Sequence, residues 1–317
     1  MSAYGSLGYE DLPMYSLGAG IRSDYGAMIP PGGRVYYVRN PVNVNGDSED
    51  VASRCISSLN GALTQCRPNG GDTIFVLPGH TETIPIGEYL TNLVPGVTVI
   101  GLGNGNARPT FTWAGATSTW GIDLPNVSIR NCVLNLDPGA GTVTVANPIT
   151  ISAPGCSLLG CKIRAGSSAT CKVGTAIAAL AGSTDLSLFG NDVWGATAAE
   201  CVALVSFNAS HNLRFMGNSL VGATSSAAAG VMQFTGAAST FIKVRDCQLR
   251  NNKALSSVVV TGLAGVSGEV DNVFMTGLSD AGLTSFWSVP ASLTFGAQVY
   301  VANTIGERAA LFGTASA

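Results

Sequence analysis

Charge is scarce in this chain. Only 11% of its 317 residues are Asp, Glu, Lys or Arg, and the net charge is −3, with the two signs scattered along the sequence. An ordinary soluble domain has about a quarter of its residues charged. A nearly neutral, scattered charge offers no basic surface, so we expect neither nucleic acid nor a membrane surface as a partner. The low charge instead predicts a surface that protein partners cover.

Long apolar runs are also missing. No stretch approaches the roughly 20 residues that a membrane-spanning helix needs. Residues 1–20 lack the basic start and the continuous apolar segment of a secretion signal. We therefore expect a chain that is made in the cytoplasm. Disorder is excluded, because 46% of the residues are hydrophobic and the mean hydropathy is +0.32.

Metal-binding patterns are missing as well. The chain has two histidines, His80 and His211, and the spacings of its eight cysteines do not match a zinc site. Without a secretion signal, we expect the cysteines to be reduced and to fill core positions. The sequence predicts neither a metal site nor a cofactor.

What the chain does contain is a repeat. Each copy is a short apolar strand, a small or polar corner residue and a second apolar position. The copies begin at Val97, Val127, Cys156, Leu186, Leu213, Phe241 and Val266. Ankyrin and tetratricopeptide arrays have similar periods, but here the apolar residues alternate as in strands, and Gly, Ser, Thr and Asn separate the copies. The pattern predicts an all-β parallel β-helix of about eight coils over residues 71–290.

The corner positions predict a ladder of polar side chains. Five of the corners are Asn or Asp, namely Asn131, Asn191, Asn218, Asp246 and Asn272. Stacked corner amides can bond to the backbone or to the amide one coil away, so we interpret these residues as structural. Glycines precede three of the corners, which indicates a bend with positive φ. These are Gly160, Gly190 and Gly217.

The two ends of the chain differ from the repeat. Residues 35–70 hold a strand and then the best helical pattern of the chain, over residues 48–63, which we expect to cap the open end of the core. Residues 1–34 form an extended arm, either folded along its own rod or, as we prefer, docked on a neighbouring subunit. Its docking candidates are Tyr4, Tyr9, Met14, Tyr15 and Tyr25. Residues 291–317 are expected to close the other end.

Catalytic groups do not fall into register. Glycoside hydrolysis needs two carboxyl groups about 5–5.5 Å or 6.5–9.5 Å apart. Asp192 has no acid one coil away, and Asp246 and Asp271 sit at positions expected to face opposite sides. His80 and Glu82 have the composition of an acid/base pair, but a turn with solvated side chains is the interpretation we favour. The sequence therefore predicts that the protein is not an enzyme.

Residues 70–84, GGDTIFVLPGHTETI, carry a resemblance together with the helix before them and VPGVTVIGLG after them. They resemble the opening of right-handed parallel β-helix proteins of tailed bacteriophages. The resemblance is firmest over residues 35–165, and the repeat continues to about residue 275. It implies a right-handed β-helix and a virion structural protein, commonly a trimer.

Within that resemblance, we expect a non-enzymatic capsid decoration, or cement, protein. It would be a homotrimeric knob on the capsid surface, held to the major capsid protein by its N-terminal arm. The alternative is a tailspike or tail fibre that binds or cleaves host surface polysaccharide. Enzymatic tailspikes usually carry clustered acids and a large C-terminal domain, and both are missing from this sequence.

Overall fold

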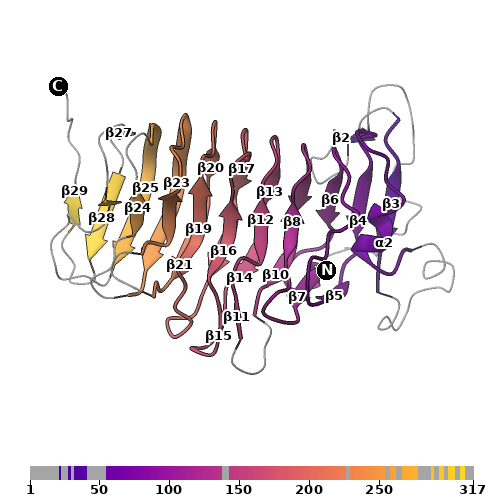
Figure 1. Cartoon of the computed structure of the whole chain (residues 1–317), viewed down its shortest axis with the longest axis horizontal. Helices are drawn as coiled ribbons and strands as arrows, with labels where there is room; N and C mark the ends of the chain where they lie inside the picture. Colours follow the sequence, from indigo (N-terminus) through magenta and orange to yellow (C-terminus); the bar gives the residue numbers. More distant parts are fainter. Residues whose placement is uncertain are drawn as a thin grey trace, which may run out of the picture.

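The computed structural model describes residues 32–40, 55–137, 143–225, 229–253, 258–261 and 266–277, together with the backbone of short strands at 21–22, 28–29, 287–288, 293–295, 299–303 and 308–310. Within these residues the chain is an all-β parallel solenoid of about seven turns, close to the eight coils expected (Figure 1). In the described part of the chain, no helix is long and apolar enough to cross a membrane.

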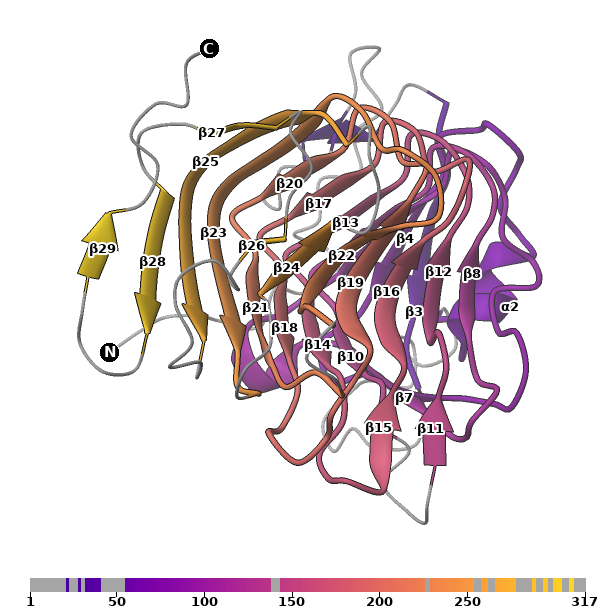
Figure 2. The ribbon, with the colours of Figure 1, turned by 60° about the vertical axis from the view of Figure 1, so that its left-hand side comes forward.

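Three faces of parallel strands surround one core (Figure 2). The first face contains β3 Val35–Val38, β4 Thr73–Val76, β6 Thr98–Gly101, β9 Ser128–Arg130, β13 Ser157–Leu159, β17 Ser187–Phe189, β20 Arg214–Met216 and the first halves of β23 Ile242–Asn251 and β25 Gly268–Gly277. The second face contains β5 Thr81–Ile84, β7 Thr110–Trp113, β10 Val133–Asn135, β14 Lys162–Arg164, β18 Asp192–Trp194, β21 Ser219–Gly222 and the second halves of β23 and β25. The third face contains β8 Trp120–Ile122, β12 Ile149–Ile151, β16 Thr175–Ala179, β19 Ala203–Asn208, β22 Met232–Thr235, β24 Val259–Thr261 and β26 Trp287–Ser288.

The remaining elements lie outside these faces or at their ends. A pair of antiparallel strands, β1 Ile21–Arg22 and β2 Met28–Ile29, precedes the solenoid, and β11 Val143–Val145 pairs with β15 Cys171–Val173. At the C-terminal end, β27 Leu293–Phe295 and β28 Val299–Asn303 extend the sheet from β25, and β29 Arg308–Ala310 runs antiparallel to β28. A short 3-10 helix, η3, spans Gly105–Ala107.

Stacked apolar columns build the core. On the first face, one inward column is Val99, Ile129, Leu158, Leu188, Phe215, Val244 and Val270. All of its members are at most 2% exposed. Each fully buried side chain of this kind contributes about 1.5–3 kcal/mol to stability. A single coil cannot bury these side chains by itself, so the stacking of neighbouring coils stabilises the fold. The apolar residues that alternate with polar ones in the sequence are the inward-facing residues of each strand.

The helix at the N-terminal end is shorter than the sequence predicted. The only helical part of residues 48–63 among the described residues is α2, Leu59–Leu63. Ile56 is extended and forms a parallel bridge with Val38, so the helix cannot begin before it. Ser58 then caps α2, with its hydroxyl accepting the N–H of Gly61. The helix does contribute buried side chains to the end of the core, as expected of a cap. Residues 41–54 lie outside the described residues.

Candidate functional site

A carboxylate occupies the first inward position of the second face. Glu82 on β5 lies opposite Phe111 on β7, and the same column continues with Leu134 on β10. Phe111 and Leu134 are fully buried, whereas Glu82 stands where the column meets the open N-terminal end. A carboxylate therefore stands at the end of the apolar core. Its partial burial costs free energy unless hydrogen bonds or an opposite charge replace its contacts with water.

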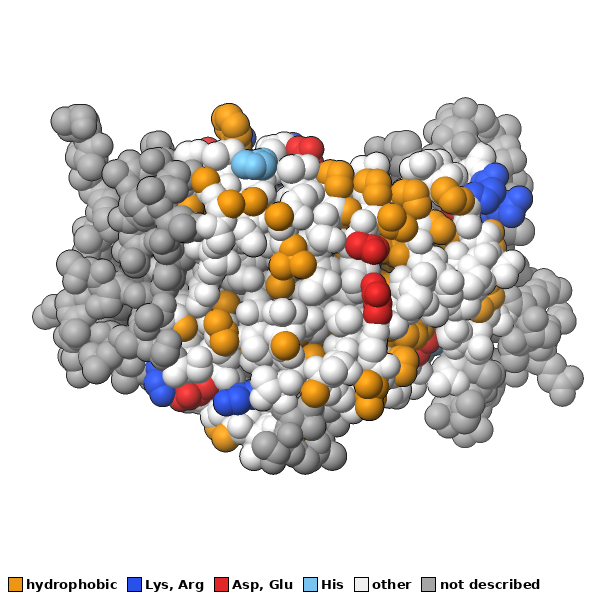
Figure 3. All heavy atoms as spheres, viewed as in Figure 1, with side chains coloured by type: hydrophobic (Ala, Val, Ile, Leu, Met, Phe, Trp, Pro, Cys, Tyr) orange, Lys and Arg blue, Asp and Glu red, His pale blue; other side chains and the backbone are white. Residues whose placement is uncertain are grey.

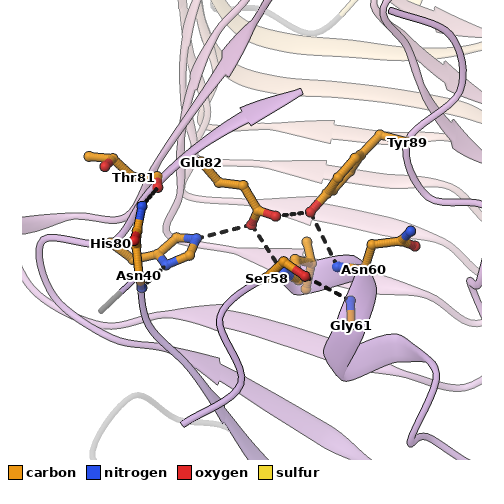
Figure 4. A network of polar contacts seen from close by, with 9 residues as sticks. Asn40, Ser58, Asn60, Gly61, His80, Thr81, Glu82 and Tyr89 are labelled. Atoms are coloured by element: carbon orange, nitrogen blue, oxygen red, sulfur yellow. Dashed lines mark hydrogen bonds and ion pairs between the residues drawn. The ribbon is translucent and has the colours of Figure 1, made fainter. Parts of the chain in front are cut away.

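Three donors converge on Glu82 (Figure 4). The Tyr89 hydroxyl donates to Oε1. The backbone N–H of Leu59 and the Nε2 of His80 each lie 3.0 Å from Oε2. Leu59 is the first residue of α2, so the carboxylate binds an N–H that the helix leaves unpaired. Burial, and then the charge of Glu82, raise the pKa of Tyr89, which keeps the hydroxyl protonated and donating.

The proton positions follow from the partners of His80. Its side chain is fully buried, and its Nδ1 accepts the backbone N–H of Asn40 at 2.9 Å. The other nitrogen, Nε2, therefore carries the proton and donates it to Glu82. Both imidazole nitrogens and both carboxylate oxygens are thus occupied within the chain. The Oε2 atom of Glu82 accepts two hydrogen bonds and Oε1 accepts one, so most of the acceptor capacity of this carboxylate is used in holding the end of the solenoid. The favoured expectation of a solvated turn is wrong for the buried His80.

A hollow of about 280 Å³ lies beside the cluster. Its lining residues are Asn40, Ser57, Thr81, Glu82, Thr83, Thr110 and Thr112. The threonines stack in register, Thr81 opposite Thr110 and Thr83 opposite Thr112. A ligand here would meet hydroxyl groups, because the carboxylate is already engaged. Among these lining residues there is no imidazole or amine to activate a hydroxyl as a nucleophile.

The acids examined as catalytic candidates are not placed as a pair. Asp246 accepts a hydrogen bond from the side chain of Asn272 one coil away. Asp271 lies opposite Arg245 in the ladder between β23 and β25. Asp192 lies opposite a serine, as its register predicted. Across the described residues, no group of three or more His, Cys, Asp or Glu side chains is arranged to hold a metal ion.

The predicted corner ladder is divided between two neighbouring columns. The left-handed bend itself, with φ between +48° and +65°, is made by Asn131, Gly160, Gly190, Gly217, Asp246 and Asn272. The next position faces inward, is buried, and is occupied by Cys132, Cys161, Asn191, Asn218 and Cys247. The three glycines have the positive φ that was expected of them. Asn191 and Asn218, however, follow the bend and do not form it.

The two inward amides bond as the ladder predicted. Asn191 accepts the N–H of Cys161 at 3.0 Å and donates to the carbonyl of Leu158 at 2.8 Å. Asn218 repeats this pattern one coil on, accepting from the N–H of Asn191 at 2.9 Å and donating to the carbonyl of Leu188 at 2.8 Å. Each amide therefore links successive coils and satisfies backbone groups that the bend leaves unpaired.

A second left-handed column runs along the solenoid and was missed in the sequence. It consists of Asn69, Gly96, Asn126, Gly155, Asp185, Asn212 and Phe241, all with positive φ. The signal was present, because Pro95-Gly96, Pro125-Asn126 and Pro154-Gly155 recur at the coil period. Asn, Gly and Asp tolerate this conformation, whereas a phenylalanine does so at a cost. Phe241 is nevertheless 74% exposed.

Polar groups surround this exposed ring. Nδ1 of His211 lies 2.7 Å from the hydroxyl of Thr240, and Asn212 donates to the carboxylate of Asp185. We call Asp185, His211, Asn212, Thr240 and Phe241 the corner ridge. In Figure 3 a protruding hydrophobic side chain and an imidazole stand together at the upper margin. The ridge combines an exposed aromatic ring with hydrogen-bonding groups along one corner of the solenoid.

Two sheet faces have contrasting outer surfaces. On the first face, Leu159, Phe189 and Met216 stack in one outward column, which we call the apolar stripe. On the third face, the outward residues opposite one another in the ladder are Gly121, Thr150, Ala178, Ser206 and Gln233. None of these is charged, but the carboxylate of Glu88 lies against Gly121, so the uncharged part of the face runs from β12 to β22. Figure 3 shows Asp and Glu side chains near the middle of this view and Lys and Arg side chains at its margins.

The other predicted residues fall into two groups. The arm candidates Tyr4, Tyr9, Met14, Tyr15 and Tyr25 lie outside the described residues. All eight cysteines are free thiols, seven of them buried and one, Cys55, partly exposed. Burial raises the pKa of Cys161 to about 11 and those of Cys66, Cys201 and Cys247 to about 12. The cysteines are therefore core residues, as expected.

Comparisons with models of protein families, with curated proteins and with solved structures gave no match to this chain.

Proposed function

We propose that this chain is a structural protein of a bacteriophage virion that decorates and stabilises the capsid. It would act as a homotrimeric knob, bound to the major capsid protein through its N-terminal arm. Its work would be mechanical, because area buried between subunits adds to the stability of the shell, and several weak attachments act together.

The uncharged third face carries this proposal. Its outward residues in register from β12 to β22 are Thr150, Ala178, Ser206 and Gln233. Packing a charged surface against a partner requires desolvation of every unpaired charge. The part of the face from β12 to β22 avoids that cost, and the centres of protein interfaces are depleted of charged residues in the same way. Such a face suits permanent contact with another protein subunit.

The saturated polar cluster supports a structural role as well. Glu82, His80 and Tyr89 use their polar atoms on each other and on the backbone near α2. Groups held in this way rigidify the end of the solenoid. A rigid rod transmits load between neighbours, which a capsid under internal pressure requires.

A second candidate, a fibre that binds host glycan, is favoured by the corner ridge. Phe241 presents an open aromatic face, and His211, Asp185 and Asn212 stand beside it as hydrogen-bonding groups. An amphipathic sugar ring needs both kinds of contact. Binding of soluble host polysaccharide to the wild-type chain, with loss in Phe241→Ala, would favour this candidate over decoration.

Removing residues 1–34 tests the decoration proposal. The shortened chain is expected to remain a soluble β-solenoid by circular dichroism, because the described apolar core contains none of these residues and, of the described hydrogen bonds to the first coil, the deletion removes only those that Gly32 and Arg34 make. Added to capsids from phage that lack the gene, it should no longer co-sediment, whereas the full chain should. Equal occupancy by the shortened and full chains would contradict attachment through the arm.

A further inference from the structure

The apolar stripe is a surface without a described cover. Phe189 is 53% exposed, and its column neighbours Leu159 and Met216 are partly exposed. Nearer the N-terminal end, the same outward column is Tyr37, Phe75 and Ile100. There the side chains pack together, with Phe75 at 5% and Ile100 at 1% exposure. The outward side of this face is therefore a packing surface, and the stripe is its open part.

Cations surround the stripe. Arg130 precedes Leu159 in the same column, and Arg214 and Lys243 occupy the neighbouring outward column beside it. No described acid forms an ion pair with any of these three side chains, although Glu269 lies opposite Lys243 in the ladder between β23 and β25. Arg245, at the far end of the stripe, is neutralised by Glu269. The partner of this surface should accordingly be apolar and negatively charged.

We propose that residues 1–20 of a second copy of this chain bind the apolar stripe. This segment contains three tyrosines, three leucines and two methionines. Its only charged side chains are Glu10 and Asp11, with no Lys, Arg or His. Aromatic and Met side chains suit the centre of the stripe, and the two carboxylates match Arg214 and Lys243 at its edge. The inference rests on the homo-oligomer of the proposed function and specifies the contact that forms it, which leaves residues 21–34 of the arm for the major capsid protein.

Charge favours this occupant over a symmetric contact, and the length of the segment permits it. Twenty extended residues reach at most about 70 Å, while the stripe lies about 24 Å along the solenoid from β3, at about 4.8 Å per coil. Two stripes facing each other would bring Arg130, Arg214 and Lys243 against the same cations of the second copy, which is unfavourable. An arm passed from one copy to the next buries the stripe without that repulsion.

Charge exchange between full-length chains tests the contact. Variant A carries Glu10→Lys and Asp11→Lys, and variant B carries Arg214→Glu and Lys243→Glu. Sedimentation velocity on each alone should show an oligomer dissociation constant raised roughly tenfold or more relative to wild type. Combining all four substitutions in one chain should restore it. An equimolar mixture of A and B should restore it in part, because contacts between A and B are complementary, whereas a ring of three always keeps one contact between like variants.

The outcomes separate the alternatives. A mixture that associates no more strongly than A or B alone, while the fourfold variant is restored, would place the arm on its own chain and overturn exchange between copies. A wild-type chain that is monomeric at all concentrations would also overturn the inference. As a matched control, Lys162→Glu with Arg164→Glu, on the second face, should leave the dissociation constant unchanged. None of these measurements uses capsids, so decoration can fail or succeed independently.

Discussion

At the scale of single residues, Phe241 is the position where the chain departs most from its own pattern. The equivalent residues of the preceding coils are Asn212 and Asp185, which tolerate the left-handed conformation. A phenylalanine at φ +56° is strained, and its ring is 74% exposed, so burial does not offset the strain. Strain that packing does not require points to a contact residue.

We predict that Phe241→Asn stabilises the protein by about 1 kcal/mol, because the substitution removes left-handed strain at little loss of buried area. Urea denaturation followed by circular dichroism measures the change. Phe189→Asn is the control, since Phe189 is also exposed but lies within strand β17, where Asn is disfavoured. A Phe241→Asn protein less stable than wild type would show that the ring packs on the solenoid.

The residue scale also shows what the sequence could and could not reveal. The seven copies of the repeat coincide with the first-face strands from β6 to β25, and Gly160, Gly190 and Gly217 were correctly expected to have positive φ. The sequence pattern placed Asn191 and Asn218 in the same column as Asn131, although they lie one position later in the coil. The error arose because an Asn fits both the left-handed bend and the inward position after it. Asn131 takes the first role and Asn191 the second, and a single-sequence pattern does not separate them.

At the scale of elements, the N-terminal end depends on the carboxylate of Glu82. We predict that Glu82→Gln lowers the free energy of unfolding by about 2–3 kcal/mol, because an amide places a donor against the N–H of Leu59 or the hydroxyl of Tyr89. Hydrogen exchange at the amide of Leu59 should accelerate more than exchange in the central coils. Glu88→Gln, a nearby acid, is the control and should change neither quantity by more than about 0.5 kcal/mol. Unchanged exchange at Leu59 would contradict the role given to Glu82.

A second carboxylate ties the first coil together. Asp72 is buried and accepts hydrogen bonds from the N–H groups of Arg34 at 2.7 Å and Arg67 at 2.8 Å. Burial alone would raise its pKa, but the hydrogen bonds from Arg67 and Arg34, with the charge of Arg67, lower it below the usual value of 3.8. The stabilisation is therefore present above the unfolded-state pKa and is lost as the pH falls through the lower folded-state pKa.

Acid unfolding tests whether the pKa of Asp72 is lowered in the folded protein. Between pH 5 and pH 2, Asp72→Asn should lose less stability than wild type, because the titrating group is gone, although it is less stable at pH 7. Asp123→Asn, an exposed acid, should keep the wild-type slope. The measurement is the free energy of unfolding against pH, and parallel curves for wild type and Asp72→Asn would contradict the lowered pKa.

The elements were predictable where their pattern was long and repeated. The strands from β6 to β25 contain alternating apolar and polar residues. This alternation is weak within any one coil, but it becomes clear when the seven copies are compared. The cap helix was expected over residues 48–63 but begins at Leu59, because the parallel bridge between Ile56 and Val38 overrides the helical spacing. A tertiary pairing of this kind leaves no local signal in the sequence.

At the scale of the whole molecule, the core controls the reactivity of the thiols. Seven of the eight cysteines are buried, and burial raises the pKa of Cys161 to about 11 and that of Cys247 to about 12. We predict that a thiol reagent at pH 8 labels no more than one cysteine, Cys55, in the native protein and all eight in denaturant. Rapid native labelling of several cysteines, counted by mass spectrometry, would contradict one continuous core. Cys55→Ser should abolish the native labelling and serves as the control.

The outer surfaces could not be predicted to the same degree. Which side of each strand faces inward follows from hydrophobicity, but which outward residues stack depends on the register between coils 26 to 30 residues apart. The apolar stripe and the uncharged face therefore emerge from the assembled solenoid. The saturation of Glu82 and His80 likewise depends on α2 and β3 meeting β5 in space.

The central claim, that this solenoid decorates a capsid, is tested most directly by cryo-electron microscopy of intact virions with and without the gene. We expect rod-shaped density that is repeated across the icosahedral shell in wild-type particles and absent from the deletion. Density restricted to the tail would contradict it and would favour the glycan-binding fibre.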